Sequence, residues 1–260
     1  MLLAIAVSSG LAVATRSSVA KAEAGTVTSN ALGLDACADP TAAHLLEFWE
    51  GTPYLFWGIY IGGANMGCPS QPNLSQSYIS AITDGSSQFW DLAPLWVGPQ
   101  PPCTTLSGVT TFSSNAGTAY QQGYGQAQSA YNTETSLGMG SRVPVNYDLE
   151  PWNTSNGGCV AATQSFVAGW SAFFVFAGVY GSRIASGLAD LADSSPPQHI
   201  WGAQYDGDSN TANMDNLGGL WIANQRLKQY QGNVYVTENG LTMEVDEDSV
   251  DGPLYSYPPS

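Results

Sequence analysis

The sequence predicts an α/β protein built as a (β/α)8 barrel of the TIM type, with an irregular last third. Short apolar runs alternate with amphipathic stretches along most of the chain, a pattern typical of a parallel sheet covered by helices. Roughly 235 residues follow the N-terminal leader, which is near the size of such a barrel. The last third holds several strand-like runs and little helix. This favours a closing barrel over the alternative, an open doubly wound sheet.

The spacing of apolar residues predicts each element of the first half. Short runs rich in aromatic and branched residues indicate strands, and apolar residues repeated every three or four positions indicate helices. Pro94 interrupts the third strand and leaves its boundary open, and Asn73 is expected to cap the second helix. In chain order the expected elements are a strand at 31–36, a helix at 41–50, a strand at 54–61, a helix at 73–83 and a strand at 89–97.

The alternation continues in the second half. Gly123 and Gly125 weaken the first helix expected there, whereas the second is strongly apolar. No low-complexity linker or internal repeat divides the chain, so residues 25–260 are expected to form a single domain. In chain order the expected elements are a helix at 120–137, a strand at 143–150, a helix at 160–176, a strand starting at 178–180, a helix at 184–191 and short strands at 200–205, 220–223, 226–230 and 241–245.

The N-terminus predicts export. An apolar run from Leu2 to Ala14 precedes a small-residue cleavage site at 20–22 or 22–24, so residues 1–24 are expected to be a signal peptide. The run is too short to span a bilayer, and no stable membrane insertion is expected. No basic residue precedes it. Either the start is assigned too late and a basic segment is missing, or the signal is degenerate.

Composition and cysteines fit a secreted or cell-envelope protein. Only 10% of residues are charged, well below the usual quarter. Four cysteines fit two disulfides in an oxidising compartment, with four buried free thiols as the alternative. Three pairings are possible, and the order of the strands favours one of them. That pairing joins Cys68 to Cys103 and Cys37 to Cys159.

The charge balance bears on partners and on the active site. The net charge of −15 repels nucleic acid and anionic membranes, so a neutral substrate is the expected partner. The oligomeric state is left open. After the leader the cations are few, and a buried carboxylate is therefore less readily explained as half of a salt bridge. These cations are Arg142, Arg183, Arg226 and Lys228.

Asp148 and Glu150 form the central candidate for chemistry. They lie two residues apart on a predicted strand, and the period of two directs both side chains to one face. Pro151 and Trp152 end the strand, which places the pair at the rim where barrel enzymes carry their active sites. Two close carboxylates resist ionising together, so one can keep a proton and act as a general acid. Glycosidic hydrolysis needs this combination, although such a pair is often merely solvated.

Two further acids follow predicted strands. Asp35 ends the first strand; it could instead cap the following helix, but Asp39 is better placed for that role. Asp246 follows an apolar strand near the end of the chain, with a flexible acidic tail as the alternative.

Aromatic side chains cluster beside these strand ends and are candidates for stacking on sugar rings, although most aromatic residues serve the core. The candidates are Tyr60, Trp96, Trp152, Tyr180, Tyr205 and Tyr230.

The sequence lacks the motifs that other kinds of catalysis require. His44 and His199 are isolated, and the chain has no HExxH, no nucleophile triad, no P-loop, no GxGxxG fingerprint and no EF-hand loop. Neither a cofactor nor a metal is therefore expected.

Several short motifs together resemble one family. Their order and spacing over about 31–252 are similar to a secreted actinobacterial family of glycoside-hydrolase-like proteins (domain of unknown function 1906). That family is related to the family 25 glycoside hydrolases, the muramidases that cut peptidoglycan. The motifs are Gly-Leu-Asp at 33–35, Tyr-Ile-Gly-Gly at 60–63, Leu-Trp-Val-Gly at 95–98, Tyr-Asp-Leu-Glu at 147–150, Gln-Tyr-Gln-Gly at 229–232 and Val-Asp at 245–246.

The resemblance implies a barrel with acids at its carboxyl-end rim. It makes Glu150 the proton donor and gives Asp148 the role of stabilising positive charge or orienting the substrate's N-acetyl group. Asp35 and Asp246 would complete an acidic floor. Asp248 stands where the muramidase pattern has Asn, so the late element can be aligned on either Asp246 or Asp248.

Two hypotheses of different class follow. The first is a secreted hydrolase of a cell-envelope polysaccharide, with peptidoglycan as the first candidate. The second is a catalytically silent barrel that binds envelope glycan or supports wall assembly. A peptidase or esterase is a weaker third hypothesis, because no nucleophile triad is present.

Overall fold

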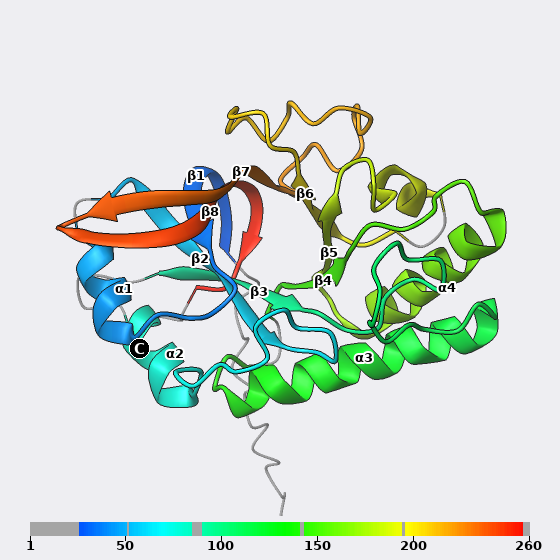
Figure 1. Ribbon diagram of the computed structural model, residues 1–260, viewed down its shortest axis with the longest axis horizontal. Helices are drawn as coiled ribbons and strands as arrows, with labels where there is room; N and C mark the ends of the chain where they lie inside the picture. Colours follow the sequence, from blue (N-terminus) through cyan, green and yellow to red (C-terminus); the bar gives the residue numbers. More distant parts are fainter. Residues whose placement is uncertain (1–25, 51, 85–89, 141–142, 194–195, 257–260) are drawn as a thin grey trace, which may run out of the picture.

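A closed eight-stranded barrel forms the centre of the computed structural model, which describes residues 26–50, 52–84, 90–140, 143–193 and 196–256 (Figure 1). The expected leader, 1–24, lies outside the described residues. The strands are β1 (Thr26–Asp35), β2 (Tyr54–Gly62), β3 (Asp91–Trp96), β4 (Val145–Leu149), β5 (Ala177–Ser182), β6 (His199–Ala203), β7 (Arg226–Glu238) and β8 (Leu241–Leu254). The helices are α1 (Ala42–Trp49), α2 (Gln76–Thr83), α3 (Ala116–Ser136), α4 (Gly157–Phe173) and the short 3-10 helix η1 (Leu188–Ala192).

The predicted TIM-type barrel and its irregular last third are confirmed. Strands β1 to β7 pair in parallel, whereas β8 is antiparallel to both β7 and β1 and closes the barrel. In the described part of the chain, helices follow β1 to β5 but none separates β6 from β7 or β7 from β8. Closure excludes the open doubly wound sheet. No helix of the described residues is long and apolar enough to cross a membrane.

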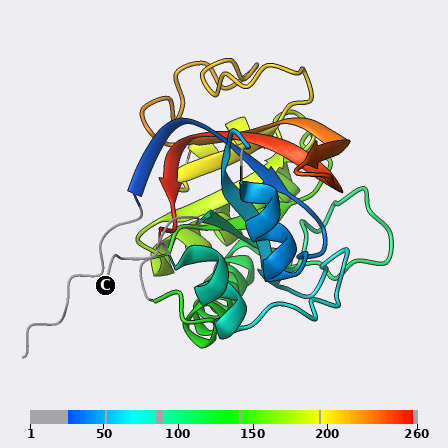
Figure 2. The same ribbon diagram turned by 90° about the vertical axis from the view of Figure 1, so that its left-hand side faces the viewer.

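The β7–β8 hairpin replaces the last helical connection. Its turn is Asn239-Gly240, and both residues have positive φ, 48° and 81°, as a two-residue type I′ turn requires. The Asn239 side-chain amide donates to the carbonyl oxygens of Glu47 and Glu50 at the end of α1. Figures 1 and 2 both show the hairpin beside this helix. The tip of the hairpin is therefore fixed to the first helix.

Strand alternation separates an inner from an outer core. Inside the barrel, Phe56 and Trp201 make an edge-to-face contact with ring centroids 6.4 Å apart. Between the barrel and the helices, side chains of the intervening positions such as Trp57 pack with Trp90 and other buried residues. The inner core fills much of the lower barrel with apolar atoms, together with the buried polar side chains of Asn146 and His199. The acidic interior positions lie at the other, carboxyl-end rim.

The predicted strand at 220–223 is wrong. The structure has a series of turns between β6 and β7, and Trp221 has a φ of 53°, which an extended strand excludes. The buried Arg226 guanidinium donates to backbone carbonyls of this loop, those of Thr211, Ala212, Gly218 and Leu220. These bonds take up backbone acceptors that a sheet would otherwise use, and they fold the loop around the cation.

Three predicted helix starts also need correction. Ser75 rather than Asn73 caps α2, accepting from the Tyr78 amide at 3.2 Å, while the Asn73 side chain donates to the Asp39 carbonyl. Thr41 rather than Asp39 caps α1. The expected helix at 184–191 shortens to η1, because Gly187 adopts a left-handed conformation just before it. The Asp39 side chain accepts instead from the Trp57 indole at 3.2 Å.

Helices α3 and α4 pack at unusually close range through two glycines, side by side in Figure 1. A methyl group on Gly123 would lie 2.0 Å from the Phe166 carbonyl oxygen, and one on Gly169 would lie 2.0 Å from that of Tyr120. Each helix therefore presents a glycine to the backbone of the other. Gly123, which weakens the helix in isolation, is the residue that lets the two helices meet.

Candidate active site

The barrel topology brings five acids to one rim. Asp35 is the last residue of β1, Asp148 lies at the end of β4 and Glu150 follows it. Strand β8 runs the other way, so its middle reaches the same rim: Asp246 lies opposite Asp35, and Asp248 lies opposite Gln229 of β7. Among the described residues, no lysine or arginine forms an ion pair with any of the five. The rim is thus an acid cluster without a counter-cation.

Asp148 and Glu150 lie in each other's electric field. Asp148 is 3% exposed, and burial, then the charge of Glu150, then that of Asp35 hold its pKa well above the usual range. Glu150 is only partly buried, and this burial raises its pKa as well. One oxygen of Asp148 has no hydrogen-bond partner among the described residues. Strongly interacting acids titrate as a unit, so the pair readily holds one proton.

Asp35 and Asp246 are joined by the side-chain amide of Gln229. Its nitrogen donates to Asp35 at 2.7 Å and to Asp246 at 2.9 Å, and its oxygen accepts from the Tyr180 and Tyr205 hydroxyls at 2.8 and 2.9 Å. Because Gln229 is fully buried, these bonds fix which way the amide points. Both aspartates must offer it an accepting oxygen.

Asp248 shares a proton with Asp35. Burial and the charge of Asp246 raise the pKa of Asp35 to about 7, while hydrogen bonds from Asp248, Gln229 and Tyr60 act in the opposite direction. Burial, followed by the charge of Asp35, holds the pKa of Asp248 well above its usual range. Asp248 also accepts from the Trp201 indole at 2.9 Å. Asp248 therefore belongs to the cluster beside Asp246, and neither lies in a loose tail.

The sequence did not indicate Gln229 as a site residue, and it offered Asp248 only as an alternative to Asp246. The period of two in β7 could have indicated Gln229, because it shares the inward face with Leu227.

Three of the six aromatic candidates lie at this rim. The Tyr60 hydroxyl is 3.4 Å from Asp35, and Tyr180 and Tyr205 bind Gln229. Tyr205 is 62% exposed, so its ring is open to a ligand.

The other three aromatic candidates need correction, because Trp96, Trp152 and Tyr230 are at most 8% exposed. The Trp96 indole donates to Gln126 and that of Trp152 to the Ser186 carbonyl. Tyr230 follows the inward-facing Gln229 and points out of the barrel. These rings serve packing.

Glu150 lies where two pockets meet. The larger, of about 650 Å³, is lined among others by Glu150, Tyr180, Arg183 and Tyr205. The smaller, of about 280 Å³, is lined among others by Glu150, Asp148 and Tyr60. A ligand that filled both pockets would cross Glu150.

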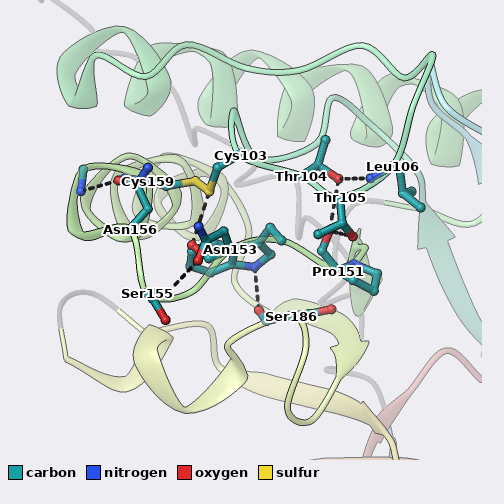
Figure 3. Close-up of a disulfide and its surroundings, with 12 residues drawn as sticks. Cys103, Thr104, Thr105, Leu106, Pro151, Asn153, Ser155, Asn156, Cys159 and Ser186 are labelled. Carbon is teal, nitrogen blue, oxygen red and sulfur yellow. Dashed lines mark hydrogen bonds between the residues drawn. A yellow bond between two sulfur atoms is a disulfide. The ribbon is translucent and has the colours of Figure 1, made fainter.

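The leaning towards a Cys68–Cys103 and Cys37–Cys159 pairing is wrong. The bonds are Cys37–Cys68 and Cys103–Cys159, with Cα atoms 5.6 and 6.1 Å apart. Each joins the segments that follow two adjacent strands: β1 with β2, and β3 with β4. At Cys103 the loop after β3 lies against the segment after β4, since Asn153 donates to the Cys103 carbonyl and Thr104 to the Pro151 carbonyl (Figure 3). This second disulfide braces the segment that follows Glu150.

Among the described residues, no group of three or more His, Cys, Asp or Glu side chains is arranged to hold a metal ion. His199 is buried inside the barrel at the start of β6, and burial lowers its pKa to about 3. It is therefore neutral near physiological pH and lies apart from the acids of the rim. The chemistry available at this site is that of carboxyl groups.

Comparison with known proteins decides the family. A family model described as Rv2525c-like, glycoside hydrolase-like domain matches residues 47–250. The chain belongs to this family. None of the curated proteins matches the Rv2525c-like chain.

Solved structures share the fold of the Rv2525c-like chain at low identity. An uncharacterized protein of B. stearothermophilus has 14% identity and a TM-score of 0.56, over 85% of this chain and 96% of that one. The catalytic domain of endolysin Ply40, from bacteriophage P40 of Listeria monocytogenes, has 15% identity and a TM-score of 0.52, over 85% and 93%. The spore cortex lytic enzyme SleM of Clostridium perfringens has 10% identity and a TM-score of 0.51, over 85% and 67%.

The free energy of unfolding of the Rv2525c-like chain is expected to fall as the pH rises from about 4 to about 7. The folded state holds protons on Asp35 and Asp39 up to a pKa of about 7, whereas the unfolded chain loses them near 3.8. The folded state thus binds more protons in this window, and the stabilisation present at low pH is lost as these groups ionise. His199, with a folded pKa of about 3 against 6.5, acts in the opposite sense but is a single group.

Thermal unfolding followed by circular dichroism between pH 4.5 and 7.5, at constant ionic strength, checks this prediction. Asp39→Asn should flatten the slope, because it removes one of the acids whose pKa is raised in the folded state. A melting temperature that increased with pH across this range would contradict the prediction.

Proposed function

We propose that this protein is a secreted glycoside hydrolase that cleaves a cell-envelope polysaccharide, with peptidoglycan as the first substrate to test. The observation that carries the proposal is the place of Glu150. It is a protonatable carboxyl group at the junction of two pockets, next to a second acid and within a glycoside-hydrolase-like barrel. The two disulfides support secretion, since they persist in oxidising compartments.

In the proposed reaction Glu150 is the general acid. A glycan that lies across both pockets would exclude water from Glu150 and raise its pKa further, so that the carboxyl group is protonated when the glycosidic oxygen approaches. The proton passes to this oxygen as the bond to the anomeric carbon breaks. In the free protein the deeper Asp148 holds the proton of the pair more readily than Glu150. In the proposed complex this proton lies on Glu150, and the Asp148 carboxylate stabilises the positive charge that develops on the sugar. Water then adds to the anomeric carbon and gives a proton to the Glu150 carboxylate, which restores the general acid and completes the hydrolysis.

The remaining rim residues bind and orient the sugar in this proposal. The exposed face of Tyr205 offers a surface for a pyranose ring. Tyr180 and Tyr60 lie deeper, and their hydroxyls bind Gln229 and Asp35. Asp35 and Asp248 hold a proton between them below Glu150, which keeps part of the acid cluster neutral.

Two of the structural neighbours support this substrate class, because one is an endolysin catalytic domain and the other a spore cortex lytic enzyme. The alternative is a barrel that binds envelope glycan without cutting it. The burial of most of the acids favours this alternative. Asp35, Asp148 and Asp248 are at most 3% exposed, and only Glu150 and Asp246 are more open.

Incubation of the purified protein with peptidoglycan sacculi separates the two functions. The expected result is the appearance of new reducing ends, with soluble fragments identified by mass spectrometry. An arabinan-type polymer serves as the comparison glycan. Co-sedimentation with sacculi without any release of reducing ends from either polymer would favour the binding function and contradict hydrolysis.

A further inference from the structure

Strand β4, which contains Asp148 and leads directly into Glu150, extends beyond the end of its neighbour β3. Strand β3 pairs with β4 only at Leu95 and Trp96, opposite Asn146 and Tyr147. The chain then leaves the sheet through Pro99. On the other side β5 continues to pair with Asp148 and Leu149. On the β3 side, therefore, no strand backbone reaches the peptide groups of Asp148 and Glu150.

The side chain of Gln100 fills this gap. Its amide nitrogen donates to the Asp148 carbonyl oxygen at 2.9 Å, and its amide oxygen accepts from the Glu150 backbone N–H at 2.9 Å. In a parallel sheet, one residue of a strand donates to residue i−1 of its neighbour and accepts from residue i+1. With Leu149 as residue i, the Gln100 amide makes the same two bonds that the backbone N–H and C=O of one β3 residue would have made.

The orientation of this amide is fixed. Gln100 is fully buried, and its nitrogen makes a further bond to the Gly98 carbonyl at 3.1 Å. Its backbone is held as well, since its N–H donates to Thr110 and its carbonyl accepts from Phe112. The amide therefore cannot turn over without losing bonds at both ends. It connects a braced loop directly to the two acids.

We propose that Gln100 is a positioning residue: its side-chain amide replaces a missing strand partner and holds the Asp148 and Glu150 carboxyl groups in their productive arrangement. Gln100 also lines the smaller pocket, beside both acids. It is not a proton donor or acceptor in the reaction. Its catalytic consequence rests on the proposed function, whereas its effect on Glu150 does not.

Two substitutions of nearly equal size separate positioning from simple packing. Gln100→Met removes all three side-chain bonds, and kcat is expected to fall about 100-fold at every pH while KM changes less than about threefold, because misplacement by about 1 Å costs this much. Gln100→Glu can make both backbone bonds only when it is protonated, since an ionised carboxylate has no donor for the Asp148 carbonyl.

Gln100→Glu is therefore expected to approach wild-type activity at acid pH and to lose it as the pH rises, with one more ionisation in its profile than wild type. The titratable groups that face the new carboxyl group are Asp148 and Glu150, and both also ionise in wild type. Subtracting the wild-type profile isolates the new group. Gln164→Met is the matched control, since that amide donates to the Asp190 carbonyl away from the rim. Its kcat should stay within about twofold of wild type.

A readout independent of hydrolysis completes the test. In protein labelled with ¹³C-glutamate, the Glu150 resonance is assigned by its loss in Glu150→Gln and then titrated. In Gln100→Met the Glu150 carboxyl should be released towards water, and its midpoint should fall by about half a pH unit or more. An unchanged Glu150 midpoint in a folded Gln100→Met variant overturns the proposal.

If Gln100→Met does not fold, the titration curve of the Glu150 resonance in Gln100→Glu decides instead. Below the pH at which the new carboxyl group ionises, the curve should follow wild type, and above that pH it should depart from it. A curve that follows wild type throughout overturns the proposal. If wild type cuts no glycan, only the proposed function fails, and the titration still decides the role of Gln100.

Discussion

Glu150→Gln is expected to lower the rate of reducing-end release by about 10²- to 10⁴-fold, the contribution of a positioned general acid. The amide keeps the size of the side chain and its hydrogen-bonding reach but has no acidic proton to give to the glycosidic oxygen. Glu150 is only one of the residues that line each of the two pockets. Glycan binding to the variant should therefore persist. Initial rates on peptidoglycan and co-sedimentation of the same preparation measure the two quantities separately.

Two variants make this result specific. Glu47→Gln removes the same charge from an exposed position on α1 and should leave the rate unchanged. Asp148→Asn should lower the rate as well, because it removes the charge proposed to stabilise the sugar cation. Neither rim variant should lower the melting temperature, since each removes an acid whose ionised form is penalised by burial. Full activity of Glu150→Gln would overturn the assignment of the acid.

Gly123→Ala and Gly169→Ala should each lower the free energy of unfolding by about 3–5 kcal/mol, at the upper end of what single substitutions do. The new methyl group would lie 2.0 Å from a backbone oxygen of the facing helix in either case. A backbone cannot swing aside as the end of a side chain can, so α3 and α4 must separate. Phe166 and Trp170, which pack against Tyr147 of β4, would then lose their fit.

Gly125→Ala is the control for the glycine pair. It lies in the same helix, and a methyl group there would meet nothing within 4 Å. It should therefore stabilise the protein by up to about 1 kcal/mol, through the higher helix propensity of alanine. Urea unfolding of the three variants measures the differences. The double variant should cost less than the sum of the single ones, because the first alanine already separates the helices. Equal stability of Gly123→Ala and Gly125→Ala would refute the close contact.

Several features of the structure could be predicted from local patterns in the sequence. The alternation of strands and helices predicted the barrel, and the period of two placed Asp148 and Glu150 on one face of β4. The scarcity of cations was equally informative. In the described part of the chain, Arg226 and Lys228 bind groups of the loop between β6 and β7. The rim acids described there form no ion pairs. These predictions succeed because each depends on neighbours within a few residues or on composition.

Pairings between distant segments could not be predicted in this way. The disulfides depend on which way the loop after β3 folds, and the fate of the aromatic residues depends on whether each ring faces the barrel interior, a helix or the solvent. Tyr205 and Trp152 are both aromatic residues that follow a strand in the sequence, yet Tyr205 is 62% exposed and Trp152 is 4% exposed.

The sequence by itself determined that two carboxyl groups stand together at the end of an inner strand, because the geometry of one strand suffices for that. Only the tertiary structure decided that Gln229 joins Asp35 to Asp246, that Asp248 shares the proton of Asp35, and that the Gln100 amide stands in for a missing strand beside Glu150. These contacts join residues from 17 to 213 positions apart. Their geometry is set by the closure of the barrel, which no local pattern in the chain records.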